Sequence, residues 1–400
     1  MPRSIPGAPA RAPAQVISLA ALDADPYPIL RLLRAEAPVA WVEPLRMWFV
    51  TRYDDVVEVI RDPVRFSTDS PGSTIRDTFG SQMLSAEGED QRRYKTHCAA
   101  PFNTRAVRER GGPLVEGRVR TLVDGFAGQG RTELRASLAG PLALYTVAMV
   151  LGIPERHHPA IREWYYAFAA SLANFAWNPE VRRRGHAAVA EFRRTVRPLL
   201  PGLASEAPET LLGSLVAASP PALTEDEILG NALIILFGGI ETTEALILNA
   251  MWALLRHPEA LAAVRGDSGL LPAAIEEATR WESAVQSCTR HATEDVEIRG
   301  VRIPAGDTVQ CLLGAANRDP EVFADPDRYD LTRANLDRHI AFGTGRHFCL
   351  GAALARLETR VALGALLDRL PGLRLDPAHA DRPHGSEFRK PPMLNLCWDT

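Results

Sequence analysis

The sequence predicts a mainly helical fold with a smaller β-rich part. Amphipathic helical patterns dominate its 400 residues, whereas β-branched and aromatic residues gather in a few short runs. One apolar stretch after residue 224 has the length of a helix that would cross the whole molecule. With 46% hydrophobic residues, the chain can bury a large core. We therefore expect an α+β protein in which helices predominate.

The predicted strands gather in two parts of the chain. The runs 39–42 and 47–51 flank the turn Glu43-Pro44-Leu45-Arg46 and predict a hairpin. Further strands are expected over residues 296–298, 301–303 and 308–312. These runs define a small β lobe at about 37–65 and 284–312, which strands at the C-terminus complete.

A capping motif marks the start of the long helix. Thr224 and Glu227, three residues apart, form a capping box. The helical pattern continues to Arg256, and His257-Pro258 then ends it. At about 1.5 Å per residue, this helix would be roughly 45 to 50 Å long. A helix of that length can form one wall of a buried cofactor site.

Two glycines inside the same helix indicate a binding face. Each glycine lowers helix stability by about 1 kcal/mol relative to alanine, so the pair Gly238-Gly239 indicates a packing or binding requirement at this point of the helix. Gly238, Glu241 and Thr242 share one face because they stand at i, i+3 and i+4. The glycines would open room there for a small molecule. The alternative is a glycine kink followed by a solvated Glu-Thr-Thr face.

The segment Phe342-Gly343-Thr344-Gly345-Arg346-His347-Phe348-Cys349-Leu350-Gly351 would present a thiolate to a large flat cofactor. Its glycines let the backbone approach closely, and a helical run over residues 352–370 follows at once. Amides at the start of that helix would stabilise the thiolate of Cys349. The alternative is a buried structural thiol.

Composition excludes several other classes of protein. A net charge of −4 gives no case for nucleic-acid binding, and the five scattered cysteines form neither a disulfide framework nor a zinc spacing. Residues 1–15 lack the apolar stretch of a signal peptide, and the apolar run 232–240 is too short to span a membrane. We therefore expect a cytoplasmic protein without a membrane span. No Gly-x-Gly-x-x-Gly fingerprint of a fused flavin domain occurs.

The spacing Phe-x-x-Gly-x-His-x-Cys-x-Gly resembles the haem-binding loop of the cytochrome P450 superfamily. The resemblance implies a triangular helical prism around a buried haem b, with residues 1–20 as a loose arm and residues 21–400 as a single domain. It makes Cys349 the axial iron ligand and places Phe342 beside the sulfur. His347 would donate to a haem propionate, and Gly345 would allow a close approach to the haem.

The long helix resembles the distal helix of the same family. By this match, Thr242 helps to hold dioxygen and its water, while Glu241 feeds protons towards the distal oxygen. Gly238 and Gly239 would border the haem.

Three further segments carry the resemblance. Glu277 and Arg280 match a buried Glu-x-x-Arg pair that braces the proximal core, although such spacing ordinarily gives a surface ion pair. Arg290 would bind a haem propionate through charge-assisted hydrogen bonds, unless it is an ordinary surface arginine. Arg93 and Gln91 stand where many bacterial members have a propionate-binding arginine and histidine.

The resemblance implies a monomeric haem-thiolate monooxygenase that inserts one oxygen atom from dioxygen into a hydrophobic substrate. The substrate would be a steroid, terpenoid, fatty acid or aromatic compound. Electrons would come from a separate iron-sulfur ferredoxin, served by its own reductase. The expected pocket residues, which could instead be ordinary core, are Met83, Phe237, Ala284, Val285 and Met393.

A basic surface could steer the acidic ferredoxin towards the proximal side. By family analogy, the basic residues there are Arg92, Lys95, Arg105, Arg108, Arg346 and Arg356. Two rival functions stay open. One is a peroxide-driven haem-thiolate enzyme, against which the Glu241-Thr242 pair argues, and the other is a haem-binding sensor or carrier without turnover.

Overall fold

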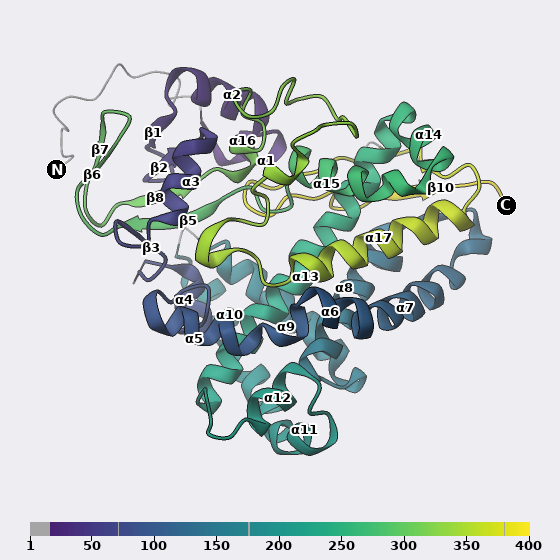
Figure 1. Ribbon diagram of the computed structural model, residues 1–400, viewed down its shortest axis with the longest axis horizontal. Coiled ribbons are helices and arrows are strands. Elements are labelled where there is room, and N and C mark those ends of the chain that lie inside the picture. Colours follow the sequence, from purple (N-terminus) through teal and green to yellow (C-terminus); the bar gives the residue numbers. More distant parts are fainter. Residues whose placement is uncertain (1–16, 71, 175–176, 380) are drawn as a thin grey trace.

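The computed structural model describes residues 17–70, 72–174, 177–379 and 381–400. Within these ranges the chain is mainly helical, and its short strands form three small sheets (Figure 1). The predicted fold class is confirmed. Residues 1–16 of the expected N-terminal arm lie outside the described residues.

The long helix α13 (Glu225–Arg256) passes through the middle of the molecule (Figure 1). It begins with the predicted capping box, in which Thr224 Oγ1 accepts from the amide of Glu227 and Glu227 Oε2 accepts from the amide of Thr224. In the described part of the chain, α13 is the one helix long and apolar enough to cross a membrane. However, 78% of its most apolar window is buried inside the protein. Its apolar surface is therefore used in packing.

Helices from the whole chain pack around α13. Those in contact with it are α4 (Thr74–Phe79), α5 (Gly88–Cys98), α8 (Gly140–Leu151), α9 (His158–Leu172), α10 (Pro179–Val196), α12 (Leu211–Ala217), α14 (Pro258–Gly266), α15 (Leu271–Trp281) and α17 (Ala352–Arg369). Farther out lie α6 (Thr104–Ala106), α7 (Gly112–Asp124) and α11 (Leu200–Glu206).

Two apolar cores divide α13 between them. Its residues up to Ile240 join one core, and those from Ile247 onwards join the other. The polar residues 241–244 lie between these cores. The interruption of the apolar pattern thus places polar groups at the centre of the fold.

The five-stranded sheet has the order β1-β2-β8-β5-β3. The predicted hairpin is formed by β1 (Val39–Val42) and β2 (Met47–Val50), with Val39 opposite Val50. Strands β8 (Thr308–Cys311), β5 (Cys288–Ala292) and β3 (Phe66–Ser67) extend the sheet. Residues from 37–65 and 284–312 therefore form one lobe as predicted, together with α2 (Tyr27–Glu36), α3 (Tyr53–Arg61) and α16 (Leu313–Ala316). Two further predicted strands, β6 (Val296–Ile298) and β7 (Val301–Ile303), pair with each other in a separate hairpin.

The prediction that the C-terminal strands complete this lobe is wrong. Strand β10 (Asn395–Cys397) instead pairs with both β4 (Arg131–Glu133) and β9 (Arg374–Leu375), on the side of the molecule away from the lobe (Figure 1). Leu396 and Trp398 are buried in the second helical core, next to residues of α7. Burial of these two side chains keeps the C-terminal segment against the helices.

The predicted boundary of the N-terminal arm at residue 20 is also wrong. Ile17 is only 4% exposed, and Ser18 caps α1 (Leu19–Ala24) by accepting a hydrogen bond from the amide of Ala21. Ile17 and Leu22 share a small apolar core with α2 and β1. Residues 17–20 are therefore part of the folded domain.

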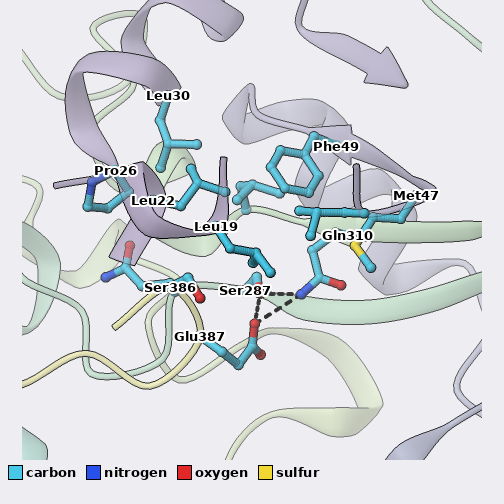
Figure 2. Close-up of a pocket in the computed structure, with 13 residues that line it drawn as sticks. Leu19, Leu22, Pro26, Leu30, Met47, Phe49, Ser287, Gln310, Ser386 and Glu387 are labelled. Carbon is cyan, nitrogen blue, oxygen red and sulfur yellow. Dashed lines mark hydrogen bonds between the residues drawn. The ribbon is translucent and has the colours of Figure 1, made fainter. Parts of the chain in front are cut away.

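A small cavity of about 50 Å³ lies between this N-terminal segment and the β lobe. Figure 2 shows Glu387 at one end of it, hydrogen-bonded to Ser287 and Gln310. The other lining groups shown include Leu19, Leu22, Pro26, Leu30, Met47 and Phe49. Burial raises the pKa of the Glu387 carboxyl to about 7, and the negative charge of Cys288 adds to this rise.

The raised pKa of Glu387 predicts a stability that falls with rising pH. The folded state holds this proton more tightly than the unfolded state, so the stabilisation is present below the ordinary pKa and is lost as pH rises to about 7. Glu387→Gln removes the titration. Between about pH 5 and about pH 8, wild-type unfolding free energy should fall by about 1 to 2 kcal/mol more than that of the variant. Equal pH slopes in urea unfolding would contradict the prediction.

Candidate active site

The cysteine loop folds through two left-handed glycines. Gly343 and Gly345 have φ of 70° and 67°, values that other residues rarely adopt. The amide of Cys349 donates to the carbonyl of Phe342 at 2.9 Å, which closes the loop. The sulfur then lies just before the start of α17. The local sequence thus presents the thiol at a helix N-terminus, as predicted from the glycine positions.

The surroundings of the Cys349 thiol act on its pKa in opposite directions. Burial raises the pKa of the thiol. The amides of Gly351 and Ala352, together with the charges of Lys95 and Arg356, oppose the rise by stabilising the thiolate. The ring of Phe342 lies beside this group, with the Arg356 guanidinium 4.3 Å from its centroid.

Helix α5 holds the cysteine loop through one of its faces. Gln91 Nε2 donates to the carbonyl of Arg346 at 3.0 Å, and Lys95 Nζ donates to the carbonyls of Arg346 and Phe348 at 2.6 and 2.7 Å. Gln91 and Lys95 stand one turn apart, so they share a face. The i, i+4 spacing from Gln91 indicated that Lys95 could also contact the cysteine loop, whereas it was predicted only as part of the surface that faces ferredoxin.

Arg93 is not brought to this site. Its guanidinium contacts Glu227 at 2.6 Å and Asp90 at 2.9 Å, and it also donates to the carbonyl of Ala222. The reason is helical geometry, because Arg93 is two residues from Gln91 and projects from another face of α5. The expected contact of Arg93 with a propionate is therefore wrong. Arg93 instead ties α5 to the start of α13.

His347 and Arg290 lie near one another. His347 Nε2 is 3.2 Å from Glu87 Oε1, and Glu87 accepts from both the amide and the hydroxyl of Thr68. Burial lowers the pKa of His347, and the nearby positive charge of Arg290 lowers it further. Glu87 was missed by the sequence analysis, since nothing in its local pattern distinguishes it from a solvated acid.

Arg290 is a buried cation whose partners do not include a carboxylate. It is 4% exposed, and its Nη1 donates to the carbonyl of Thr289 at 2.8 Å. Among the residues that the structure describes, no acidic group lies within ion-pair distance of it. A buried guanidinium in this state fits a bound anionic group.

A buried ion pair braces the chain that leads to the cysteine loop. Glu277 and Arg280 have fully buried side chains and form two hydrogen bonds of 2.7 Å. Arg280 also donates to the carbonyls of Asn317, Pro326 and Arg328. Arg333 adds a second cation, 3.3 Å from Glu277, which the sequence analysis missed. The pair therefore fixes the path of residues 317–333.

The two helix glycines have different neighbours. A Cβ built on Gly238 would meet no atom within 4 Å, whereas one on Gly239 would lie 2.5 Å from Val147 of α8. Gly238 thus leaves open space, as predicted, but Gly239 allows α8 and α13 to pack closely. The expectation that Gly239 opens room for a ligand is wrong. Thr242 Oγ1 donates to the carbonyl of Gly238 at 2.6 Å, so its hydroxyl is held at the same place on the helix.

Four of the five expected pocket residues are connected to Phe237 or to its neighbours. Phe237 packs against Phe388 with ring centroids 5.5 Å apart, and Phe388 pairs in a β-bridge with Val285. The carbonyl of Ala284 accepts from the amide of Arg389, the residue that follows Phe388. The backbone of Met83 is tied to α13 through Asn231, in the same apolar core as Phe237.

Met393 does not belong to this group. It is 52% exposed, and its neighbours Pro391 and Leu394 are the residues that turn inward. The expected substrate contact of Met393 is therefore not supported by its placement. The aromatic residues Phe79 and Tyr165 complete the cluster around Phe237, at centroid distances of 6.2 and 6.3 Å. Phe79 and Phe388 carried no sequence signal that distinguished them from ordinary core.

Comparison with known proteins identifies the class of enzyme that this fold and thiol site define. A family model described as "Cytochrome P450" matches residues 187–387. The chain is 41% identical over 371 residues to cytochrome P450 monooxygenase PikC of Streptomyces venezuelae, covering 88% of this chain and 86% of the relative. It is 35% identical to nocardicin C N-oxygenase of Nocardia uniformis, over 94% of this chain and 96% of that one.

Solved structures agree with this result. The structure of P450BioI in complex with a hexadec-9Z-enoic acid ligated acyl carrier protein has a TM-score of 0.88 and 30% identity, covering 96% of this chain and all of that one. CYP109E1 of Bacillus megaterium in complex with testosterone has a TM-score of 0.87 and 25% identity, with the same coverage. The protein belongs to the cytochrome P450 family and is a P450 monooxygenase, an oxidoreductase that works with haem iron.

The residues present fit the haem that the family implies. Cys349 is a free thiol at a helix N-terminus, Arg290 is a buried cation available to a carboxylate, and Gly238 leaves open space. Haem iron, when bound, supplies the activation of dioxygen and the transfer of one oxygen atom.

The two glycines provide a matched pair of substitutions. Gly239→Ala should lower the unfolding free energy by about 1 to 2 kcal/mol, because the new methyl group collides with Val147. Gly238→Ala meets no protein atom and should raise it by up to about 1 kcal/mol through helix propensity. Urea unfolding of the two variants measures the difference. Val147→Ala should restore stability to Gly239→Ala, and equal effects of the two glycine substitutions would contradict the assignment.

Proposed function

We propose that this enzyme binds haem b through Cys349 and oxygenates a hydrophobic organic substrate with electrons from a separate ferredoxin, in the cytoplasm. The observation that carries the proposal is the aromatic cluster of Phe237, Phe79, Tyr165 and Phe388, whose central ring belongs to the residue that precedes Gly238 on α13. An apolar substrate held there would be next to the open space on α13.

Each residue of the site has a separate task in this proposal. Cys349 ligates the iron, and the amides of Gly351 and Ala352 stabilise its thiolate. Arg290 and His347 bind propionate groups, with Glu87 orienting the imidazole. Gln91 and Lys95 hold the loop carbonyls and thereby set the position of the sulfur. On the opposite side, Thr242 presents its hydroxyl beside Gly238, and Glu241 supplies protons.

The pocket favours a substrate with a large apolar surface. The residues around Phe237 form an aromatic and aliphatic cluster, and apolar surfaces bind ligands mainly by removing apolar area from water. Two structural neighbours were solved with testosterone and with a hexadecenoic acyl group on a carrier protein. These bound molecules support the steroid and fatty-acyl members of the proposed substrate range.

A basic groove supports docking of a ferredoxin on the proximal side. The groove has a volume of about 510 Å³ and begins where the cysteine loop joins α17. It is lined by Arg108, Arg356 and Arg360, with Glu116 and Glu276 as the acidic members. Arg356 and His339 hydrogen-bond Glu276 and, against the effect of burial, lower its pKa to about 2. Arg108, which has Glu109 at 3.7 Å, and Arg360 are exposed and would face a partner.

A ligand screen and a turnover assay test the proposed function together. Apolar compounds should shift the ferric haem from low to high spin, and a compound that does so should gain one atom of labelled dioxygen when ferredoxin, its reductase and NAD(P)H are present. Product formed with peroxide but never with ferredoxin would favour the peroxide-driven alternative. Binding without product under either condition would favour a sensor or carrier.

Loss of the thiolate tests the ligand assignment. Cys349→Ser should lose the thiolate-type spectrum of the reduced carbon monoxide complex, because a hydroxyl is a far poorer donor than a thiolate. Cys397→Ser, which removes a partly exposed cysteine of β10, is the matched control and should keep that spectrum. A thiolate-type spectrum in Cys349→Ser would show that another residue ligates the iron.

Charge reversal tests the docking surface. Arg108→Glu with Arg360→Glu should raise the apparent KM for ferredoxin on the order of tenfold at low salt, and the effect should shrink as salt is added. Arg31→Glu with Arg302→Glu changes the net charge equally on the β-lobe side and should leave this KM near the wild-type value. Equal effects of the two double variants would exclude a local docking surface.

A further inference from the structure

Lys390 brings a buried cation to the acid group of α13. Its Nζ lies 2.7 Å from Glu241 Oε1 and 2.7 Å from Glu244 Oε1. Arg135 Nε lies 2.7 Å from the same oxygen of Glu244. The side chains of Glu241, Glu244 and Lys390 are 8, 6 and 11% exposed, so this is a largely dry cluster of two carboxylates and two cations.

The cluster connects the catalytic part of α13 to the outside of the protein. Glu241 precedes Thr242, whose hydroxyl is bonded to the carbonyl of Gly238. At the other end, the Arg135 side chain is 28% exposed and donates to the carbonyl of Pro392. Lys390 lies between these ends. The hydroxyl of Tyr165 also contacts the ammonium, 3.4 Å from Nζ.

The two carboxylates have unequal dependence on Lys390. Glu244 has Arg135 as a second cation, whereas Lys390 is the cationic partner that the structure shows for Glu241. If Glu241 turned away from Lys390, the ammonium would keep Glu244 as its counter-ion. Glu241 can therefore leave and return without creating an unpaired buried cation, which would be the costly state.

We propose that Lys390 is a positioning residue for Glu241, a releasable partner that holds the carboxylate next to Thr242 and so sets the supply of protons to the oxygen chemistry. The proposal rests on the proposed monooxygenase function. Each proton that Glu241 passes inward is replaced from water at the Arg135 end, so that Glu241 returns to its starting state. Lys390 itself touches neither substrate nor cofactor in this role.

Removal of the cation tests the proposal. In Lys390→Met, Glu241 is left in a dry site without its partner and should retain a proton. Product formed per NAD(P)H should fall at least about threefold, with the lost electrons appearing as peroxide or water, and the solvent isotope effect on turnover should rise. Lys390→Arg should restore most of the coupling, because a guanidinium can bridge both carboxylates.

Infrared spectroscopy of the purified proteins gives a second readout that needs no turnover. Lys390→Met should show the carbonyl stretch of a protonated carboxyl group, and Lys390→Met with Glu241→Gln should lose that band. Thr242→Ala should lower coupling without producing the band. A folded Lys390→Met with wild-type coupling, an unchanged isotope effect and no new band would overturn the proposal.

Arg389→Met is the matched control. Arg389 is the adjacent residue, is also buried, with a side chain 5% exposed against 11% for Lys390, and pairs with Glu282 at 2.7 Å. Removal of the Arg389 side chain should lower the unfolding free energy but leave coupling and the isotope effect unchanged. If the Arg389→Met protein fails to retain haem, Glu282→Gln serves as the control instead. If Arg389→Met reproduces the Lys390→Met result, the role of Lys390 is merely structural. If wild type shows no ferredoxin-driven turnover, the proposed function fails, and the infrared bands still decide whether Lys390 positions Glu241.

Discussion

The buried pair of Glu277 and Arg280 holds the proximal half of the protein in place. One guanidinium satisfies a carboxylate and three backbone carbonyls from a segment with little regular structure. Without these bonds, residues 317–333 would lose their main internal support, and the chain leads from there into the cysteine loop. A charge pair with no access to water is stable only when nearly every donor has an acceptor, as here. The position of the sulfur is therefore set by contacts that lie far from it in sequence.

The opposite wall is defined by packing. Gly239 lets Val147 approach the backbone of α13, while Gly238, one residue earlier, leaves the facing space open. The two glycines therefore fix α13 against α8 and keep a gap on its other side. Two adjacent glycines thus have different roles, close helix packing at Gly239 and open space at Gly238, because successive residues of a helix point about 100° apart.

Patterns within short stretches of sequence predicted the features that depend on local geometry. The limits of α13, the β1–β2 hairpin and the turns before Cys349 follow from a capping box, alternating residues and glycines, respectively. Contacts between segments far apart in the chain could not be predicted from the sequence. Arg93 turns to Glu227, β10 joins β4, and Lys390 reaches Glu241 because of tertiary packing that no spacing encodes. The contact of Lys95 with the cysteine loop was partly predictable, because the sequence places Lys95 one turn after Gln91 and so on the same face of α5.

The aromatic ring of Phe388 and the ammonium of Lys390 are separated by a single residue of backbone. Phe388 packs on Phe237, and Lys390 holds Glu241 one turn farther along the same helix. Under the proposed function, a substrate that packs against the Phe388 ring would lie within two residues of the ion pair. The apolar cluster and the acid group are thus connected through one short stretch of C-terminal backbone as well as through α13.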